Sequence, residues 1–171
     1  MMHAIQYFLL GAFCFPHICF AASESNISEE RFIQFCTENS TEKIKAIILH
    51  AKNKTFLSAS EKEYGYTPLH YAVMHKNESL VLLFLEQKAN PDACDNIEQT
   101  PLHLAAEQGS INITKMLLEN HSNRFLKDEQ GNTALALAMK NKQWSISRLL
   151  ATSFPLGQEV IDPLYDTIFP S

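Results

Sequence analysis

One stretch of the chain, Tyr66-Thr67-Pro68-Leu69-His70-Tyr71-Ala72, recurs 33 residues later as Gln99-Thr100-Pro101-Leu102-His103-Leu104-Ala105. A weaker copy, Asn132-Thr133-Ala134-Leu135-Ala136-Leu137-Ala138, follows after a further 33 residues. Self-similarity at a fixed period of this length is typical of proteins that stack one small structural unit on the next. The repeat therefore predicts the architecture more strongly than any single segment does.

Each copy carries the signals of a helix start. Thr67 and Thr100 stand where an N-cap is expected, because a hydroxyl there can accept from the first unpaired helical N–H groups. Pro68 and Pro101 follow at the first helical position, where a missing N–H costs nothing. A helix is therefore predicted to begin at each proline.

A second helix is predicted after a short turn in each unit, and turn residues then lead into a hairpin-like loop. Gly65 and Gly131 provide backbone freedom in two of these loops, whereas Glu98 replaces the glycine in the middle loop and should either add a little strain or change the loop tip. The apolar faces of the second helices are predicted to be residues 80–85 in the first unit, Ile111, Ile113, Met116, Leu117 and Leu118 in the second, and Trp144, Ile146, Leu149 and Leu150 in the third.

The period and the Thr-Pro-Leu-His signature resemble those of the ankyrin repeat. The resemblance implies an all-α solenoid of stacked helix–turn–helix units with hairpin-like loops. It also implies that the signature residues are structural, and that His70 and His103 bond to backbone groups and tie adjacent repeats together. The signature residues are Thr67, Pro68, Leu69, His70, Thr100, Pro101, Leu102 and His103.

The predicted organisation has one folded array between two segments of different character. The array consists of a degenerate capping repeat at 28–57 and repeats at 62–94, 95–127 and 128–153. The two flanking segments are a signal peptide at 1–22 and an apolar tail at 154–171. The capping repeat lacks the Thr-Pro-Leu-His start, as expected of a terminal unit with one face in water. Its apolar faces are predicted to be Phe32, Ile33, Phe35 and Cys36 on one helix and Ile44, Ile47, Ile48 and Leu49 on the next.

Residues 1–22 contain no formally charged side chain and end in Cys19-Phe20-Ala21-Ala22. An apolar run that ends at small residues predicts a secretory signal cleaved after Ala21 or Ala22, and hence a secreted or periplasmic protein. An uncleaved membrane anchor or a buried helix is the alternative, because no Lys or Arg precedes the run and Pro16 and His17 interrupt it. Cys36 and Cys94, which lie outside the signal, are expected to be free thiols since they fall in different units, and a disulfide between them in an oxidising space is the alternative.

The charge balance of 14 basic against 19 acidic residues, without a run of like charges, argues against a nucleic-acid partner. The sequence contains no Gly-rich phosphate loop, Cys-x-x-Cys pair, His-Glu-x-x-His or Gly-x-Ser-x-Gly motif. We therefore expect neither catalysis nor a cofactor, a metal or a small-molecule substrate.

The resemblance implies a monomer that binds another protein through its loop tips and the exposed part of the concave helix surface. Tyr64 and Tyr66 are the expected anchors, because tyrosine offers a large contact area with few rotatable bonds. The alternative is that both rings only cover a neighbouring loop. Carried over by position, the partner-binding residues are Glu63, Tyr64, Tyr66, Met74, His75, Asn96, Ile97, Gln99, Glu107, Gln108, Glu129, Gln130 and Asn132.

The tail at 154–171 is too apolar for a solvated linker and is expected to pack on the last repeat. Alternatively, residues 162–168 resemble the Glu-Pro-Ile-Tyr type motifs of bacterial effectors, which makes Tyr165 a candidate phosphorylation site. An exported chain of this kind resembles the ankyrin proteins of host-associated bacteria. A structural spacer in an envelope or periplasm is a further alternative, and it predicts a polar concave face.

Overall fold

The fold is a single row of helix pairs, seen in a computed structural model that describes residues 27–51 and 54–152. These residues form eight α-helices and one turn of 3-10 helix, which confirms the predicted all-α solenoid. The elements are α2 (Glu29–Thr37), α3 (Thr41–His50), η1 (Thr55–Leu57), α4 (Pro68–Met74), α5 (Glu78–Glu86), α6 (Pro101–Gln108), α7 (Ile111–Glu119), α8 (Ala134–Lys140) and α9 (Trp144–Thr152).

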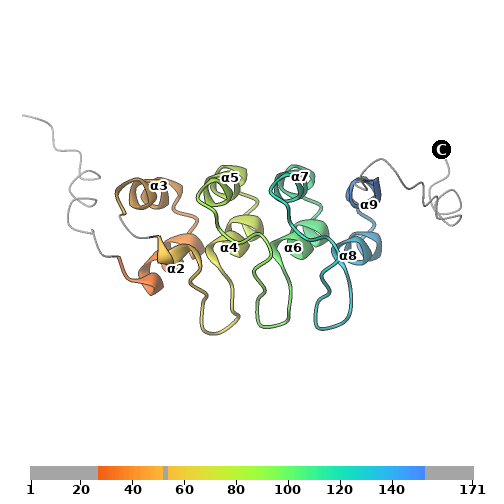
Figure 1. The fold of residues 1–171 in the computed structure, drawn as a ribbon, viewed down its shortest axis with the longest axis horizontal. Helices are drawn as coiled ribbons and strands as arrows, with labels where there is room; N and C mark the ends of the chain where they lie inside the picture. Colours follow the sequence, from red (N-terminus) through yellow and green to blue (C-terminus); the bar gives the residue numbers. More distant parts are fainter. Residues whose placement is uncertain (1–26, 52–53, 153–171) are drawn as a thin grey trace, which may run out of the picture.

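The helices form two parallel rows, and long loops project from one edge (Figure 1). We call α2, α4, α6 and α8 the inner row, since they adjoin the loops, and α3, α5, α7 and α9 the outer row. The predicted signal with Ala21 and Ala22, and the tail with Tyr165, lie outside the described residues. No helix in the described part of the chain is long and apolar enough to cross a membrane.

The starts of the inner helices follow from local chemistry. Thr67, Thr100 and Thr133 are the N-caps of α4, α6 and α8, and Pro68 and Pro101 occupy the first helical positions. The hydroxyl of Thr133 accepts from the backbone N–H of Ala136 at 3.3 Å. The hydroxyls of Thr67 and Thr133 thus each satisfy a donor that the helix itself leaves unpaired.

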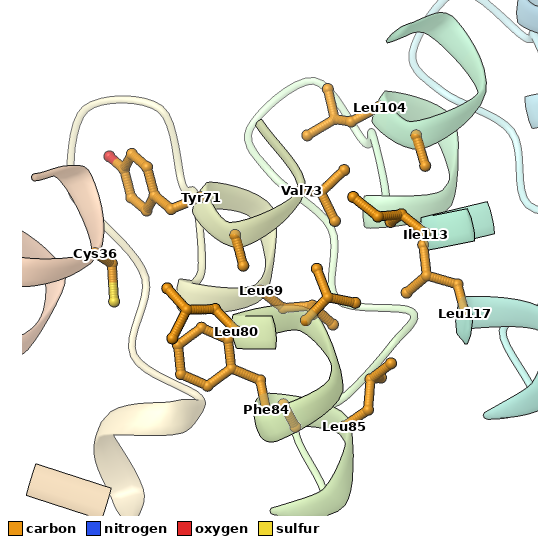
Figure 2. Close-up of a cluster of buried hydrophobic side chains, with 14 of the residues drawn as sticks. Cys36, Leu69, Tyr71, Val73, Leu80, Phe84, Leu85, Leu104, Ile113 and Leu117 are labelled. Carbon is orange, nitrogen blue, oxygen red and sulfur yellow. The ribbon is translucent and has the colours of Figure 1, made fainter. Parts of the chain in front are cut away.

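The buried side chains form one cluster that continues from one unit to the next. Figure 2 shows part of this cluster, with Leu80 and Phe84 of α5 and Ile113 and Leu117 of α7 packed inside the stack. Side chains 33 residues apart share the same burial, and their exposed fractions do not exceed 2%. They form two series, Leu80, Ile113 and Ile146, and Phe84, Leu117 and Leu150. In the inner row Ala72, Ala105 and Ala138 are equally buried, and their small side chains let adjacent helices approach closely.

The predicted apolar faces were wrong at four positions. Leu49 on α3 is 80% exposed and Leu82 on α5 is 44% exposed, and Ile111 and Trp144 are 40% and 49% exposed. Ile111 and Trp144 are the first residues of α7 and α9, where no preceding helical turn covers them. Helical spacing places a residue on a stripe, but the packed neighbour decides how wide the buried stripe is.

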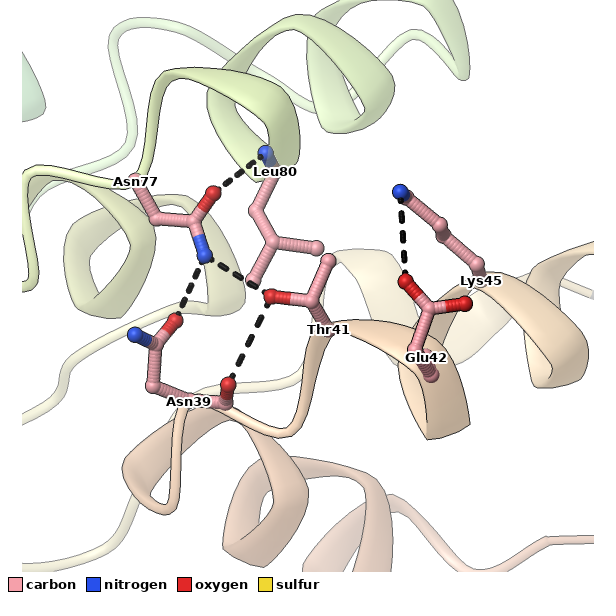
Figure 3. A network of polar contacts seen from close by, with 6 residues as sticks. All are labelled: Asn39, Thr41, Glu42, Lys45, Asn77 and Leu80. Atoms are coloured by element: carbon pink, nitrogen blue, oxygen red, sulfur yellow. Dashed lines mark hydrogen bonds and ion pairs between the residues drawn. The ribbon is translucent and has the colours of Figure 1, made fainter.

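The N-terminal unit docks through an aromatic cluster and a polar link. Phe32 packs against Phe56 and Phe84, with ring centroids 4.3 and 6.3 Å apart. The Asn77 amide donates to Asn39 Oδ1 at 2.7 Å and to Thr41 Oγ1 at 2.9 Å (Figure 3). Asn77 Oδ1 in turn accepts from the N–H of Leu80 at 3.1 Å, so one side chain caps α5 and joins two units.

The hairpin-like loops need a left-handed residue at one position. Gly65 and Gly131 have φ of 77° and 81° there, and Glu98 at the equivalent position has φ of 60°. A side chain at Gly65 would also place its Cβ 2.9 Å from the backbone nitrogen of Asn96. Both the left-handed conformation and this close approach therefore require glycine at position 65.

Replacing Glu98 by glycine is expected to raise the free energy of unfolding by about 0.5–1 kcal/mol. The left-handed conformation costs a non-glycine residue about 1–2 kcal/mol, and the greater freedom of glycine in the unfolded chain offsets part of this. Urea unfolding measures the change. The matched control is Gly131→Ala, whose Cβ would meet nothing within 4 Å and which should destabilise by a similar amount. A decrease in the free energy of unfolding on Glu98→Gly would show that the left-handed conformation of Glu98 is not strained.

The two cysteines of the described region are free thiols. Cys36 is buried in the first unit, and this burial raises the pKa of its thiol to about 12. Cys94 lies exposed in the loop that precedes α6. A thiol held in its protonated form is a poor nucleophile, so Cys36 acts as a small core residue.

Candidate functional site

Three hairpin tips form the projecting edge of the molecule. Each hairpin is closed by a backbone bond to the residue before the inner-helix cap: Glu61 N–H to Tyr66 O, Asp95 N–H to Gln99 O, and Asp128 N–H to Asn132 O, at 2.9–3.0 Å. The acidic side chain at each base accepts backbone N–H groups of its own hairpin. The shape of each tip is therefore set by the sequence of its own loop.

Adjacent tips are also bonded to each other. The N–H of Asn96 donates to Tyr64 O at 2.9 Å, and the N–H of Glu129 donates to Ile97 O at 3.0 Å. The second bond is the first one repeated, since its donor and its acceptor each lie 33 residues further along the chain. The Asn96 amide adds a bond to Glu63 O at 2.9 Å. The three tips thus form one connected edge rather than three independent loops.

The tyrosines divide between the two roles considered for them. Tyr64 is 53% exposed, and its ring stacks on that of Tyr66 with centroids 5.6 Å apart and planes 20° apart. Tyr66 is half-buried and packs edge-on against Tyr71 at 5.7 Å. The hydrogen bond that the Tyr64 phenol donates to the Glu63 carboxylate raises the pKa of Tyr64, and burial raises the pKa of Tyr66. Both phenols are therefore neutral at neutral pH, and Tyr66 supports the ring of Tyr64.

Most of the predicted partner-binding residues lie at the surface, and several also serve the fold. The exposed ones are Glu63, Tyr64, Met74, His75, Asn96, Ile97, Glu107, Glu129 and Gln130, and the half-buried ones are Tyr66, Gln99, Gln108 and Asn132. The ring of His75 bonds to Thr37 O at 3.0 Å, and Gln108 donates to Met74 O at 3.5 Å. The Asn132 amide bonds to Asp128, so its side chain is less available than its position suggests.

The buried histidines connect one repeat to the next. His70 Nδ1 accepts from the N–H of Thr67 at 3.2 Å, and its Nε2 donates to Gln99 O at 3.1 Å. His103 repeats the pattern with the N–H of Thr100 at 3.2 Å and with Asn132 O at 3.2 Å. Because a backbone N–H only donates and a carbonyl oxygen only accepts, these bonds make Nδ1 the acceptor and Nε2 the donor in both rings. Ala136 takes this position in the third repeat, so the series ends there.

A sequence profile described as ankyrin repeats (3 copies) matches residues 75–160. The chain belongs to the ankyrin-repeat family. A search of curated proteins gave no match. Ankyrin repeats are protein–protein interaction modules, and the family is typically a non-enzymatic scaffold. The profile begins after the first Thr-Pro-Leu-His segment, and the structure shows that this segment and the unit before it continue the same ankyrin stack.

Charged groups of the ankyrin tips add residues that position alone did not identify. Glu98 is exposed on the middle tip, and Asp95 at its base is buried with one carboxylate oxygen, Oδ2, lacking a partner. The sequence signal was present, since acidic residues recur at the base of each hairpin. Within residues 27–51 and 54–152, no group of three or more His, Cys, Asp or Glu side chains could hold a metal ion.

The ankyrin array is expected to lose stability below about pH 6.5 through His70. Burial lowers the pKa of His70 below its ordinary value, while the Gln99 carbonyl and the charge of Asp95 oppose this shift. Between the two pKa values the unfolded chain binds a proton that the folded chain excludes. The contribution of His70 is complete above pH 6.5 and is lost as the pH falls toward the folded pKa, with a slope of at most about 1.4 kcal/mol per pH unit.

Urea unfolding of the ankyrin array between pH 7.5 and pH 5 measures this loss. The His70→Gln variant is the control, since it removes the titrating group, and its stability should fall less steeply over the same range. An equal slope in both proteins would show that other groups carry the pH dependence.

Proposed function

We propose that this ankyrin-repeat protein binds a protein partner through its hairpin tips and the exposed ends of its inner-row helices. The observation that carries the proposal is the pairing of exposed apolar side chains on adjacent tips. Tyr64 and Ile97 are 53% and 44% exposed, and the bond between Asn96 N–H and Tyr64 O holds their hairpins together. Aromatic and aliphatic side chains held at a rigid surface are typical anchors of protein interfaces.

The alternative of a passive structural spacer fits this edge less well. A spacer needs only a soluble surface, and exposed tyrosine and isoleucine on two bonded tips contribute nothing to solubility. The packing of Tyr66 against Tyr71 accounts for Tyr66 within the fold, but it does not account for the exposure of Tyr64.

Site-specific photo-crosslinking tests the proposed surface. A benzophenone side chain placed at Ile97 should link the chain to a partner in lysate from the source cells or their host. The same group at Leu49, which is 80% exposed on the outer row, is the matched control and should give no such product. The proposal predicts that Tyr64→Ala reduces the yield at position 97 while the melting temperature changes little. An identical product from position 49, or a yield unaffected by Tyr64→Ala, would refute it.

The proposed function includes export before binding. The support is the charge-free segment 1–22 with its small residues at the end, which favours cleavage near Ala21 or Ala22 and a secreted or periplasmic mature chain. N-terminal sequencing of the chain recovered from the periplasm or medium should begin at Ala22 or Ser23. Recovery of only the full-length chain from the cytoplasm would remove export from the proposal.

A further inference from the structure

The hairpin edge holds most of the excess negative charge of the protein. Its three segments, 61–67, 94–100 and 127–133, contain six acidic and two basic residues and so have a net charge of −4, compared with −5 for the whole chain. One of the two basic residues, Lys62, is already paired with Glu30 of α2 at 2.6 Å. The exposed acidic groups are spread one to a tip, at Glu63, Glu98 and Glu129.

One carboxylate of this edge is left partly unpaired inside the fold. Asp95 is 7% exposed, and its Oδ1 accepts from the N–H groups of Ile97 and Gln99 at 3.0 and 2.8 Å, whereas Oδ2 has no partner. The equivalent Asp128 differs, because the Asn132 amide donates to its Oδ2 at 3.2 Å. Gln99 replaces that asparagine in the middle repeat and makes no such bond with Asp95. A buried carboxylate that is underpaired leaves a strong negative potential around it.

This potential reaches the tyrosine pair. His70 Nε2 bonds to Gln99 O, the Gln99 N–H bonds to Asp95, and the Tyr66 ring lies 5.9 Å from the His70 ring. The charge of Asp95 accordingly contributes to the raised pKa of Tyr66. The Tyr64 ring stacks on Tyr66, and its phenol donates a hydrogen bond to a second carboxylate, that of Glu63. Exposed ring faces beside carboxylates attract cations through both the ring quadrupole and the negative charge.

An apolar or acidic segment would bind unfavourably at this edge, because it would remove water from the carboxylates of Glu63, Glu98 and Glu129 without offering them a partner. A phosphate backbone or an anionic membrane would be repelled. Adjacent packed helices are about 8–10 Å apart, and an extended chain rises about 3.3 Å per residue. A peptide that runs along the tips therefore passes one repeat for about every three of its residues.

We propose that the partner presents an extended basic segment to the hairpin edge, with an arginine or lysine on the Tyr64–Tyr66 pair and further basic residues opposite Glu98 and Glu129. The inference rests on the proposed function and adds the chemistry of the partner to it. Basic side chains at every third position would match the spacing of the tips.

Fluorescence anisotropy of a labelled peptide, three repeats of Gly-Ser-Arg, titrated with the full chain tests the proposal. Its comparison peptide carries citrulline, the uncharged analogue of arginine, at the same positions. The arginine peptide should bind at least about threefold more tightly. A triple variant, Glu63→Gln with Glu98→Gln and Glu129→Gln, should weaken its binding by about three- to tenfold, since each surface ion pair contributes little by itself.

A matched triple variant changes one exposed glutamate on each of α3, α5 and α7 instead, Glu42→Gln with Glu86→Gln and Glu119→Gln. It loses the same net charge and should bind the arginine peptide within twofold of the original chain. Equal weakening by both triple variants would reduce the effect to overall charge and would overturn the proposal. Equal binding of the two peptides, or binding of neither, would overturn it as well.

A fourth protein examines the role of Asp95. Gln99→Asn recreates the residue pair that Asn132 and Asp128 form, and it should satisfy Asp95 Oδ2. The variant is expected to melt at a higher temperature and to bind the arginine peptide about twofold more weakly. Unchanged or tighter peptide binding at a raised melting temperature would contradict the contribution of Asp95.

The two levels of inference fail separately. A partner captured at position 97 together with equal binding of the arginine and citrulline peptides refutes the basic segment and leaves the binding function standing. Loss of site-specific capture at position 97 refutes the proposed function, and the inference with it.

Discussion

Truncating Phe84 to alanine is expected to lower the free energy of unfolding by about 3–5 kcal/mol. Phe84 on α5 is fully buried and faces Phe32 of the first unit, with ring centroids 6.3 Å apart. The variant loses the transfer free energy of the ring and leaves a cavity that the flanking helices can fill only in part. Such a loss is a large fraction of the stability of a typical small domain.

The effect should also be directional. In a linear array each unit is stabilised by its own contacts and by the interface with its neighbours. Phe84→Ala removes a side chain at the interface between α2 and the first full repeat, so amide hydrogen exchange should accelerate in α2 and α3 more than in α8. Chemical unfolding in urea measures the total loss.

Leu82→Ala is the control for Phe84, because Leu82 lies on the same helix and is 44% exposed. A change within about 0.5 kcal/mol is expected for this surface substitution. Similar losses for the two variants would mean that α5 packs with a different face from the one described.

Replacing His103 by alanine is expected to cost about 2–4 kcal/mol, the second largest effect. His103 is 1% exposed, and removing its ring leaves the N–H of Thr100 without a partner and takes from the carbonyl oxygen of Asn132 one of its two donors, the other being the N–H of Asp128. An unsatisfied buried donor or acceptor costs about 1–3 kcal/mol. Because Asn132 lies in the next hairpin, the variant should also loosen the third tip.

Thermal and urea unfolding of His103→Ala provide the test, with His121→Ala as the control. His121 is exposed on the turn after α7, and its replacement should change the stability by no more than about 0.5 kcal/mol. If His103→Ala proved as mild as the control, the histidine bonds would not be what holds adjacent repeats together.

Much of the fold followed from signals within a few residues of one another. The Thr-Pro pairs at Thr67 and Thr100 define helix starts locally, because a hydroxyl cap and a preset φ act on the next turn alone. The 33-residue recurrence of these pairs then placed the helix pairs in register. It also located Glu98 at a position that needs a left-handed residue, where its φ is 60°.

The sequence alone thus determined the class of fold, the order of its helices and the edge from which the hairpins project. The tertiary structure decided which side of each apolar stripe is covered, and so left Leu49 and Trp144 exposed. It also separated Tyr64, which projects, from Tyr66, which packs, and it paired Oδ2 of Asp128 but not that of Asp95. These outcomes depend on contacts with residues about 33 positions away in the neighbouring repeat or on the conformation of a single loop. A pattern of residue types along the chain specifies neither the distance between two such side chains nor the direction in which each one points.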